Sequence, residues 1–247
     1  MAKTQEGKTT WVREYLCPQL PYYIIFDTKQ VPKDNLESLG VVCNNIEQLR
    51  RAINRKEKIV FRPDFELDDD EEKDLIDQAC GVILQTTNYV VIFDELADVS
   101  DSFTIGKKHL KILTKGLGRG IRHVGCCQRP AKILNATILN QSDAYVYFRL
   151  GDGDYNRFKS VLPHLDKVKQ LTKFQWIYTD GIHWEIHDPI NLGGTSNVKS
   201  EPKEEIKEEK EEAESPDSVT TSDTITEDSD SDVDDLFKLG GNENATK

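Results

Sequence analysis

Three residues near the start of the chain, Gly7, Lys8 and Thr9, match the end of a phosphate-binding loop. In such a loop successive backbone N–H groups surround the phosphates, the lysine reaches the β- and γ-phosphates, and the hydroxyl group binds Mg²⁺. A helix should start at once, with its positive N-terminal end at the same anion, and should stop before Pro18. These three residues and the following Thr10 are therefore predicted to bind ATP, with Thr9 also contacting Mg²⁺.

The start of this loop departs from the full motif. Ala2 stands where a glycine usually allows the turn, and only Met1 precedes it, so the strand that should lead into the loop is missing from the sequence. Either the natural chain starts further upstream or the loop has degenerated. We favour the upstream start, because the other residues that define such a site are present together.

A second motif places acidic residues in the order that phosphate chemistry requires. The run from Tyr89 to Phe93 is apolar, β-branched and aromatic, and Asp94 and Glu95 follow it. This pattern predicts a buried strand that delivers two carboxylates to its end. Asp94 would hold Mg²⁺ through water, and Glu95 would polarise the attacking water. The acids could instead cap a following helix, but two motifs in the right order favour nucleotide hydrolysis.

The acidity of the chain is concentrated in its C-terminal part. The 247 residues include 32 basic and 44 acidic side chains, and the net charge is −12. From Thr195 onward there are 6 basic and 17 acidic residues, a net charge of −11, which leaves 26 basic and 27 acidic residues before it. This tail has few apolar side chains to offset the entropy lost on ordering. We therefore predict a P-loop ATPase domain over residues 1–194 and a disordered acidic tail over 195–247.

The same composition limits where the protein works. No stretch approaches the roughly 18 to 20 consecutive apolar residues of a membrane span, and the N-terminus lacks a charged-then-apolar signal segment. We therefore expect no membrane span and a cytoplasmic protein. The five cysteines have no metal-ligand spacing, so reduced thiols are expected. Cys126 and Cys127 fall in a predicted strand, where core thiols are expected rather than redox chemistry.

Strand and helix patterns alternate along the chain. Strands are predicted over residues 22–27, 58–62, 89–93, 122–127 and 144–150, and helices over 45–56, about 72–86, up to about 114 and over 155–162, with one more around Ile133 and Leu134. Two aromatic strands, 174–178 and 183–187, should form a hairpin. The alternation predicts an α/β fold with a mostly parallel sheet and helices on both faces. Its ligand belongs at the C-terminal ends of the strands.

The segment Gly118–His123 leads through one apolar strand to Gln128, which gives the order phosphate loop, acidic strand, arginine, strand, glutamine. This order resembles the FtsK/HerA class of DNA-pumping P-loop ATPases and looks especially like the small viral members that pump genomes into capsids. The resemblance covers roughly residues 2–190. It implies a RecA/FtsK-like fold in which Gln128 senses the γ-phosphate. It also implies that either Arg119 or Arg122 reaches the site of a neighbouring subunit.

The resemblance implies an ATP-driven translocase of double-stranded DNA that works as a ring, expected to be hexameric. It is most simply a viral genome-packaging ATPase, in the host cytoplasm or associated with the virion. A conjugation or plasmid-mobilisation pump stays open, as does a catalytically weakened protein that acts in assembly. Lys108, Lys111 and Lys115 share one face of a predicted helix and could grip a phosphate backbone, or could simply be a solvated face. The acidic tail could solubilise the chain, mimic DNA in the basic channel, or dock on a capsid or portal protein.

Overall fold

Strand β1 (Tyr23–Phe26) is buried on both of its faces, because successive side chains of a strand point to opposite sides. Ile24 and Phe26 belong to one apolar cluster, and Tyr23 and Ile25 belong to another on the other side of the sheet. A strand covered in this way belongs at the centre of an α/β sheet. The computed structural model describes residues 7–100, 103–128 and 136–190, and β1 is the middle strand of its larger sheet.

The larger sheet has five parallel strands in the order β2-β3-β1-β4-β5. The other four strands are β2 (Val41–Cys43), β3 (Ile59–Phe61), β4 (Val90–Phe93) and β5 (Arg122–Gly125). The sequence predicted all of these strands except β2. Phe26 of β1 aligns with Phe93 of β4, so both strands end at the same edge of the sheet.

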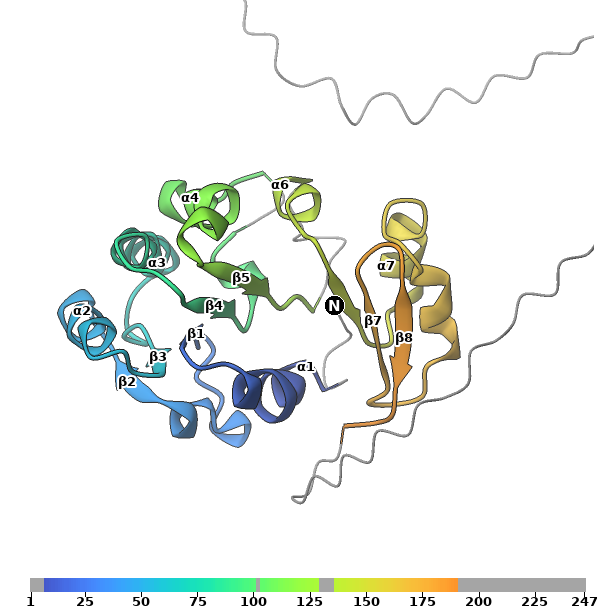
Figure 1. Cartoon of the computed structure of the whole chain (residues 1–247), viewed down its shortest axis with the longest axis horizontal. Helices are drawn as coiled ribbons and strands as arrows, with labels where there is room; N and C mark the ends of the chain where they lie inside the picture. The colour runs from blue at the N-terminus through green and yellow to red at the C-terminus, as the bar shows by residue number, and fades with distance from the viewer. Residues whose placement is uncertain (1–6, 101–102, 129–135, 191–247) are drawn as a thin grey trace, which may run out of the picture. The chain divides into compact units, whose positions relative to one another are not determined.

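Helices cover both faces of this sheet, as predicted (Figure 1). On one face lie α2 (Ile46–Asn54), α3 (Asp69–Ile83) and α4 (Lys107–Lys115). On the other face lies α1 (Lys8–Trp11), which continues as a π-helical segment (Val12–Leu16) and a 3₁₀ turn (Cys17–Gln19). The mostly parallel sheet with helices on both faces is the architecture that the sequence predicts for a P-loop NTPase.

Two helix ends differ from their predicted positions for identifiable reasons. Helix α3 begins at Asp69 rather than Glu72, because Asp68 and Glu71 form a reciprocal capping box at its start. The first helical segment runs past Pro18, which occupies the first turn of the 3₁₀ segment, where a missing N–H costs little.

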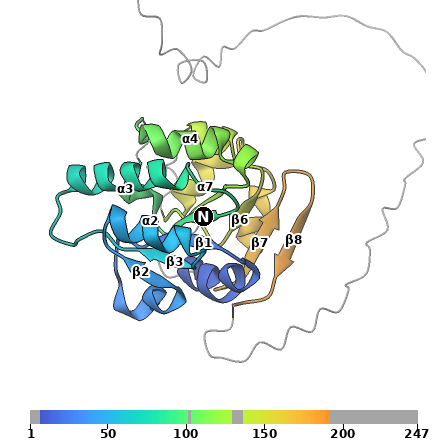
Figure 2. The ribbon, with the colours of Figure 1, turned by 60° about the vertical axis from the view of Figure 1, so that its left-hand side comes forward.

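A smaller antiparallel sheet contains β6 (Tyr145–Tyr147), β7 (Trp176–Thr179) and β8 (Trp184–His187), in that order. The predicted hairpin is confirmed, because β7 and β8 pair in antiparallel register (Figure 2). Helices α6 (Ala136–Asn140) and α7 (Asp152–Phe158) accompany this sheet, which shares an apolar cluster with α7. Strand β6 was predicted as part of one mostly parallel sheet, but it pairs with β7 instead.

Several predictions fall outside the described residues. These are the loop residues Ala2–Glu6, the helix around Ile133 and Leu134, and the acidic tail with its boundary at 194/195. The five cysteines are free and buried, and Cys126 and Cys127 follow β5 instead of lying in it. Within the ranges given above, no helix is both long enough and apolar enough to cross a bilayer.

Candidate functional site

Gly7 starts the first helix in a conformation that suits the predicted loop. Its φ of 99° lies in the left-handed region, where a side chain would strain the backbone. A Cβ atom there would also lie 3.2 Å from Cδ1 of Phe174. The next residue, Lys8, is only 7% exposed, although it is a lysine. A buried lysine beside a strand edge is unusual and indicates a charge with a defined partner.

Thr9 and Asp94 meet at the carboxyl ends of the strands. The Thr9 hydroxyl donates a hydrogen bond of 3.0 Å to Oδ1 of Asp94, the residue that directly follows β4. Burial raises the pKa of Asp94 to about 6, although the positive charge of Lys8 and the hydrogen bond from Thr9 both lower it. The structure therefore brings together two residues that are 85 positions apart in the sequence.

Glu95 lies next to the same cluster and is almost fully buried. Its Oε2 atom is 2.6 Å from Nζ of Lys29 and 4.0 Å from Nζ of Lys8. Its Oε1 atom is buried and has no hydrogen-bond partner among the described residues. One oxygen of Glu95 is thus held by two cations, while the other can accept a hydrogen bond from an incoming group.

The oxygen atoms of Thr9 and Asp94 fit a magnesium ion. Magnesium is bound in proteins by one or two carboxylates together with water and substrate phosphates, not by a closed set of protein ligands. The described part of the chain contains no cluster of three or more His, Cys, Asp or Glu side chains that could hold a metal. The hydroxyl and carboxylate lie 3.0 Å apart and are close to Lys8, so all three groups could face one metal–phosphate complex.

Lys29 is a residue of this site that the sequence did not indicate. It follows β1, and it reaches Glu95 because β1 and β4 are neighbours whose ends are in register. Asp27, at the end of β1, is buried in an ion pair with Arg62 at 2.7 Å, and Arg62 also pairs with Glu37 at 2.8 Å. The position of these residues after a buried strand was the available signal, since strand ends carry sites in such folds.

Replacement of Lys29 by methionine is expected to lower the free energy of unfolding by about 1–3 kcal/mol, because it leaves a buried carboxylate with one partner fewer. Urea denaturation measures this change. The matched control is Lys33→Met, an exposed lysine near Lys29 in the sequence, which should change stability by less than about 0.5 kcal/mol. Equal losses of stability for the two variants would show that the ion pair between Lys29 and Glu95 contributes nothing.

The remaining predicted site residues lie on β5 and around it. Gln128 follows β5 at the edge of the sheet where Asp94 and Glu95 lie. Nearby, the carbonyl of Cys126 accepts a hydrogen bond from the N–H of Leu96, which follows Glu95. Arg122 starts β5 and pairs with Val90, at the opposite edge of the sheet. Arg119 precedes it in a 3₁₀ turn. Neither arginine is brought to Lys8 within this chain.

Solved structures with the same fold include viral packaging enzymes. The genome packaging NTPase B204 of Sulfolobus turreted icosahedral virus 2, in complex with ATPγS, matches with a TM-score of 0.61 at 16% identity, over 77% of this chain and 95% of that chain. The DNA-packaging ATPase B204 of Sulfolobus turreted icosahedral virus matches with a TM-score of 0.61 at 18% identity, over the same shares. These similarities confirm the predicted resemblance at the level of the fold.

Other comparisons add little. The bacterial conjugative coupling protein TrwB reaches a TM-score of only 0.45 at 14% identity, over 63% of this chain and 45% of that chain, which is too distant to support an inference. The sequence matches no protein-family model, and no curated protein matches it.

Proposed function

We propose that this chain is an ATPase that moves double-stranded DNA, most simply as the motor that packages a viral genome. The observation that carries the proposal is the convergence of Lys8, Thr9, Asp94 and Glu95 at one edge of the sheet. These are the residue types that phosphoryl transfer requires, and they occupy the part of an α/β fold where ligands bind. The shared fold with viral packaging ATPases supports the choice of substrate.

Each residue has a distinct role in this proposal. Lys8 contacts the β- and γ-phosphates, and Thr9 and Asp94 hold Mg²⁺, which neutralises charge on the phosphates when it is bound. Glu95 accepts a hydrogen bond from the attacking water through its Oε1 atom, which has no partner among the described residues. Gln128 contacts the γ-phosphate from the end of β5, and Gly7 and Thr10 contribute backbone groups around the anion.

The positions of the arginines support a ring of subunits. Charge that develops on the γ-phosphoryl oxygens needs a cation besides Lys8 and Mg²⁺. Because Arg119 and Arg122 lie at the opposite edge of the sheet, they can supply that cation only to another subunit. We propose a homo-oligomeric, hexameric ring around DNA. The acidic tail would dock on a capsid or portal protein.

Replacement of Lys8 by methionine tests the proposed function. Methionine retains much of the buried aliphatic stem but removes the charge, so the rate of ATP hydrolysis should fall by about 10²-fold or more while the fold persists. The exposed residue Lys107 provides the matched control, since Lys107→Ala should hydrolyse ATP at the original rate. If Lys8→Met and the unmodified protein have equal rates, or neither binds ATP, the assembly role without catalysis is the better account.

A further inference from the structure

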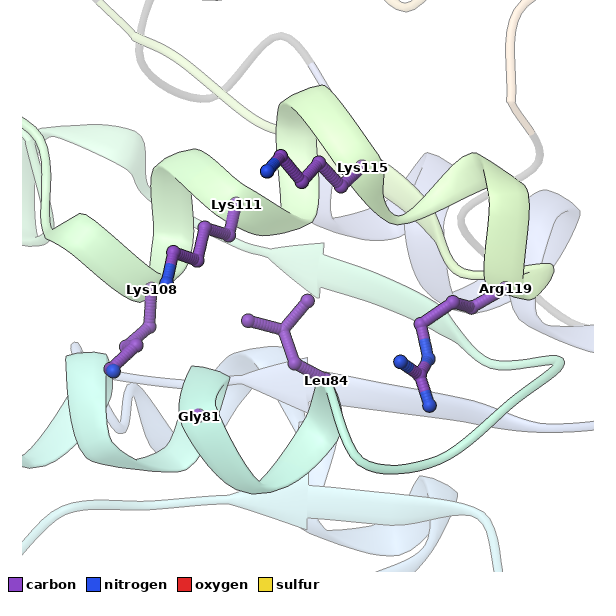
Figure 3. Close-up of a pocket in the computed structure, with 6 residues that line it drawn as sticks. All are labelled: Gly81, Leu84, Lys108, Lys111, Lys115 and Arg119. Atoms are coloured by element: carbon purple, nitrogen blue, oxygen red, sulfur yellow. The ribbon is translucent and has the colours of Figure 1, made fainter.

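A groove between α3 and α4 is lined by four positively charged side chains. It lies on the face of the larger sheet that α2, α3 and α4 cover. Its volume is about 330 Å³, and its lining consists of Gly81, Leu84, Lys108, Lys111, Lys115 and Arg119. Figure 3 shows Lys108 and Lys111 pointing from α4 toward α3, Lys115 lying along α4, and Arg119 on the far side of Leu84. Among the described residues, the lining contains no carboxylate and no aromatic ring. Within the part of the chain that the structure describes, none of the four cations forms an ion pair.

The walls of the groove hold these charges in place. Asp77 of α3 accepts hydrogen bonds from the backbone N–H groups of Lys108 at 2.7 Å and His109 at 3.1 Å, so it fixes the start of α4 against α3. The aliphatic stem of Lys108 packs over Gly81, where a Cβ would lie 3.7 Å from Cγ of the lysine. At that distance an added Cβ would make an ordinary van der Waals contact with the lysine stem. The ammonium group is then directed into solvent.

The spacing of the charges fits a polymer of phosphates better than a single small anion. Lys108 and Lys115 are seven residues apart on one helix, so their Cα atoms are separated by about 10 Å along its axis. One strand of duplex DNA presents a phosphate about every 3.4 Å along the axis. The row of lysines therefore spans about three phosphates. A free nucleotide would find no ring in this lining on which to stack its base and no acceptor to read it.

We propose that this groove binds the phosphate backbone of double-stranded DNA without reading its sequence. The inference rests on the proposed DNA-translocase function and adds the surface that grips the substrate. The groove also has a direct connection to the catalytic carboxylates. His109, next to Lys108, stacks on Phe93 with ring centroids 4.3 Å apart, and Phe93 ends the strand that leads to Asp94 and Glu95. A packed contact therefore joins α4 to the strand that carries the two carboxylates.

The test is the salt dependence of binding to a labelled duplex of mixed sequence, measured by fluorescence anisotropy with the full chain. Each cation that no longer neutralises a phosphate of duplex DNA reduces the slope of log affinity against log salt by about 0.9. The double variant Lys111→Ala/Lys115→Ala should therefore reduce the slope by about 2 and weaken binding equally for all sequences. Lys107→Ala, an exposed lysine on the same helix outside the groove, should leave the slope unchanged.

Three outcomes would overturn the proposal. The first is failure of the full chain to bind the duplex at low salt. The second is a slope that falls equally for the double variant and for Lys107→Ala. The third is that a peptide of residues 201–214 binds to the groove, and needs Lys111 and Lys115 to do so, while the duplex does not bind. That result would assign the groove to the acidic tail. ATP hydrolysis without DNA is measured in parallel, and the double variant should keep the original rate. If the unmodified protein does not hydrolyse ATP but binds DNA through the groove, the proposed ATPase function is rejected and the proposed DNA-binding groove is retained.

Discussion

Replacement of Glu95 by glutamine is expected to leave ATP bound but unhydrolysed, with turnover lowered by about 10²–10⁴-fold. The amide keeps the shape of the side chain but cannot accept a proton from water. The effect should be this large because Glu95 is almost fully buried and its Oε1 atom has no other partner among the described residues. Single-turnover hydrolysis and equilibrium binding of ATP, measured separately, distinguish the loss of chemistry from the loss of affinity.

A matched control for this variant is Asp98→Asn, which makes the same carboxylate-to-amide change three residues later. Asp98 accepts a hydrogen bond from Thr28 and lies outside the proposed set of catalytic groups. Its replacement should change turnover much less than that of Glu95. Normal turnover in Glu95→Gln would assign Glu95 a structural role. Loss of ATP binding would indicate that Glu95, and not Asp94, serves the metal.

The strands that carry the site were predictable because they are buried on both faces. Burial on both faces requires an unbroken apolar run, and the runs that became β1, β3 and β4 are of this kind. Strand β2 gives no such signal, because Val41 and Val42 are exposed and the strand has only three residues. A short, half-exposed edge strand is indistinguishable from a loop in a single sequence.

The contacts around Glu95 could not be predicted in the same way. The two carboxylates and Lys8 belong to motifs, whereas Lys29 is a single lysine in a segment without a pattern. Its contact with Glu95 depends on β1 lying beside β4, and the order of strands along the chain does not fix their order in the sheet. The same reason explains why the lysines of α4 could be placed on one helix face but not opposite Gly81 and Leu84.

The separate sheet of β6, β7 and β8 has a related explanation. The run around Tyr147 predicts a strand, and β6 confirms it, with Tyr147 itself buried. Nothing in that run specifies whether the partner is parallel or antiparallel, because hydrogen bonding in a ladder involves only the backbone. The hairpin β7–β8 is local and was predictable from its turn, but the choice of β7 as partner of β6 is not local.

One of the two arginines is expected to act in the active site of a neighbouring subunit. A cation of this kind raises turnover by about 10³–10⁵-fold. Arg122 pairs with Val90, three residues before the end of β4, so it starts about 10 Å from the catalytic edge of its own sheet. Homogeneous rings of Arg119→Ala or Arg122→Ala should show which arginine is required, since only one of the two variants should lose most of its activity.

A mixture of subunits tests whether that arginine acts across an interface. Subunits that lack the arginine keep Lys8 and Glu95, whereas Glu95→Gln subunits keep the arginine, so some mixed interfaces contain every required group. Activity should therefore recover to as much as roughly a quarter of the original rate in an equal mixture, although each variant alone is inactive. The control mixture combines Lys8→Met with Glu95→Gln and should not recover, because both groups belong to the same side of the site. Recovery in both mixtures, or in neither, would contradict a shared site, and normal hydrolysis by both arginine variants would remove the mechanistic support for a ring-shaped motor.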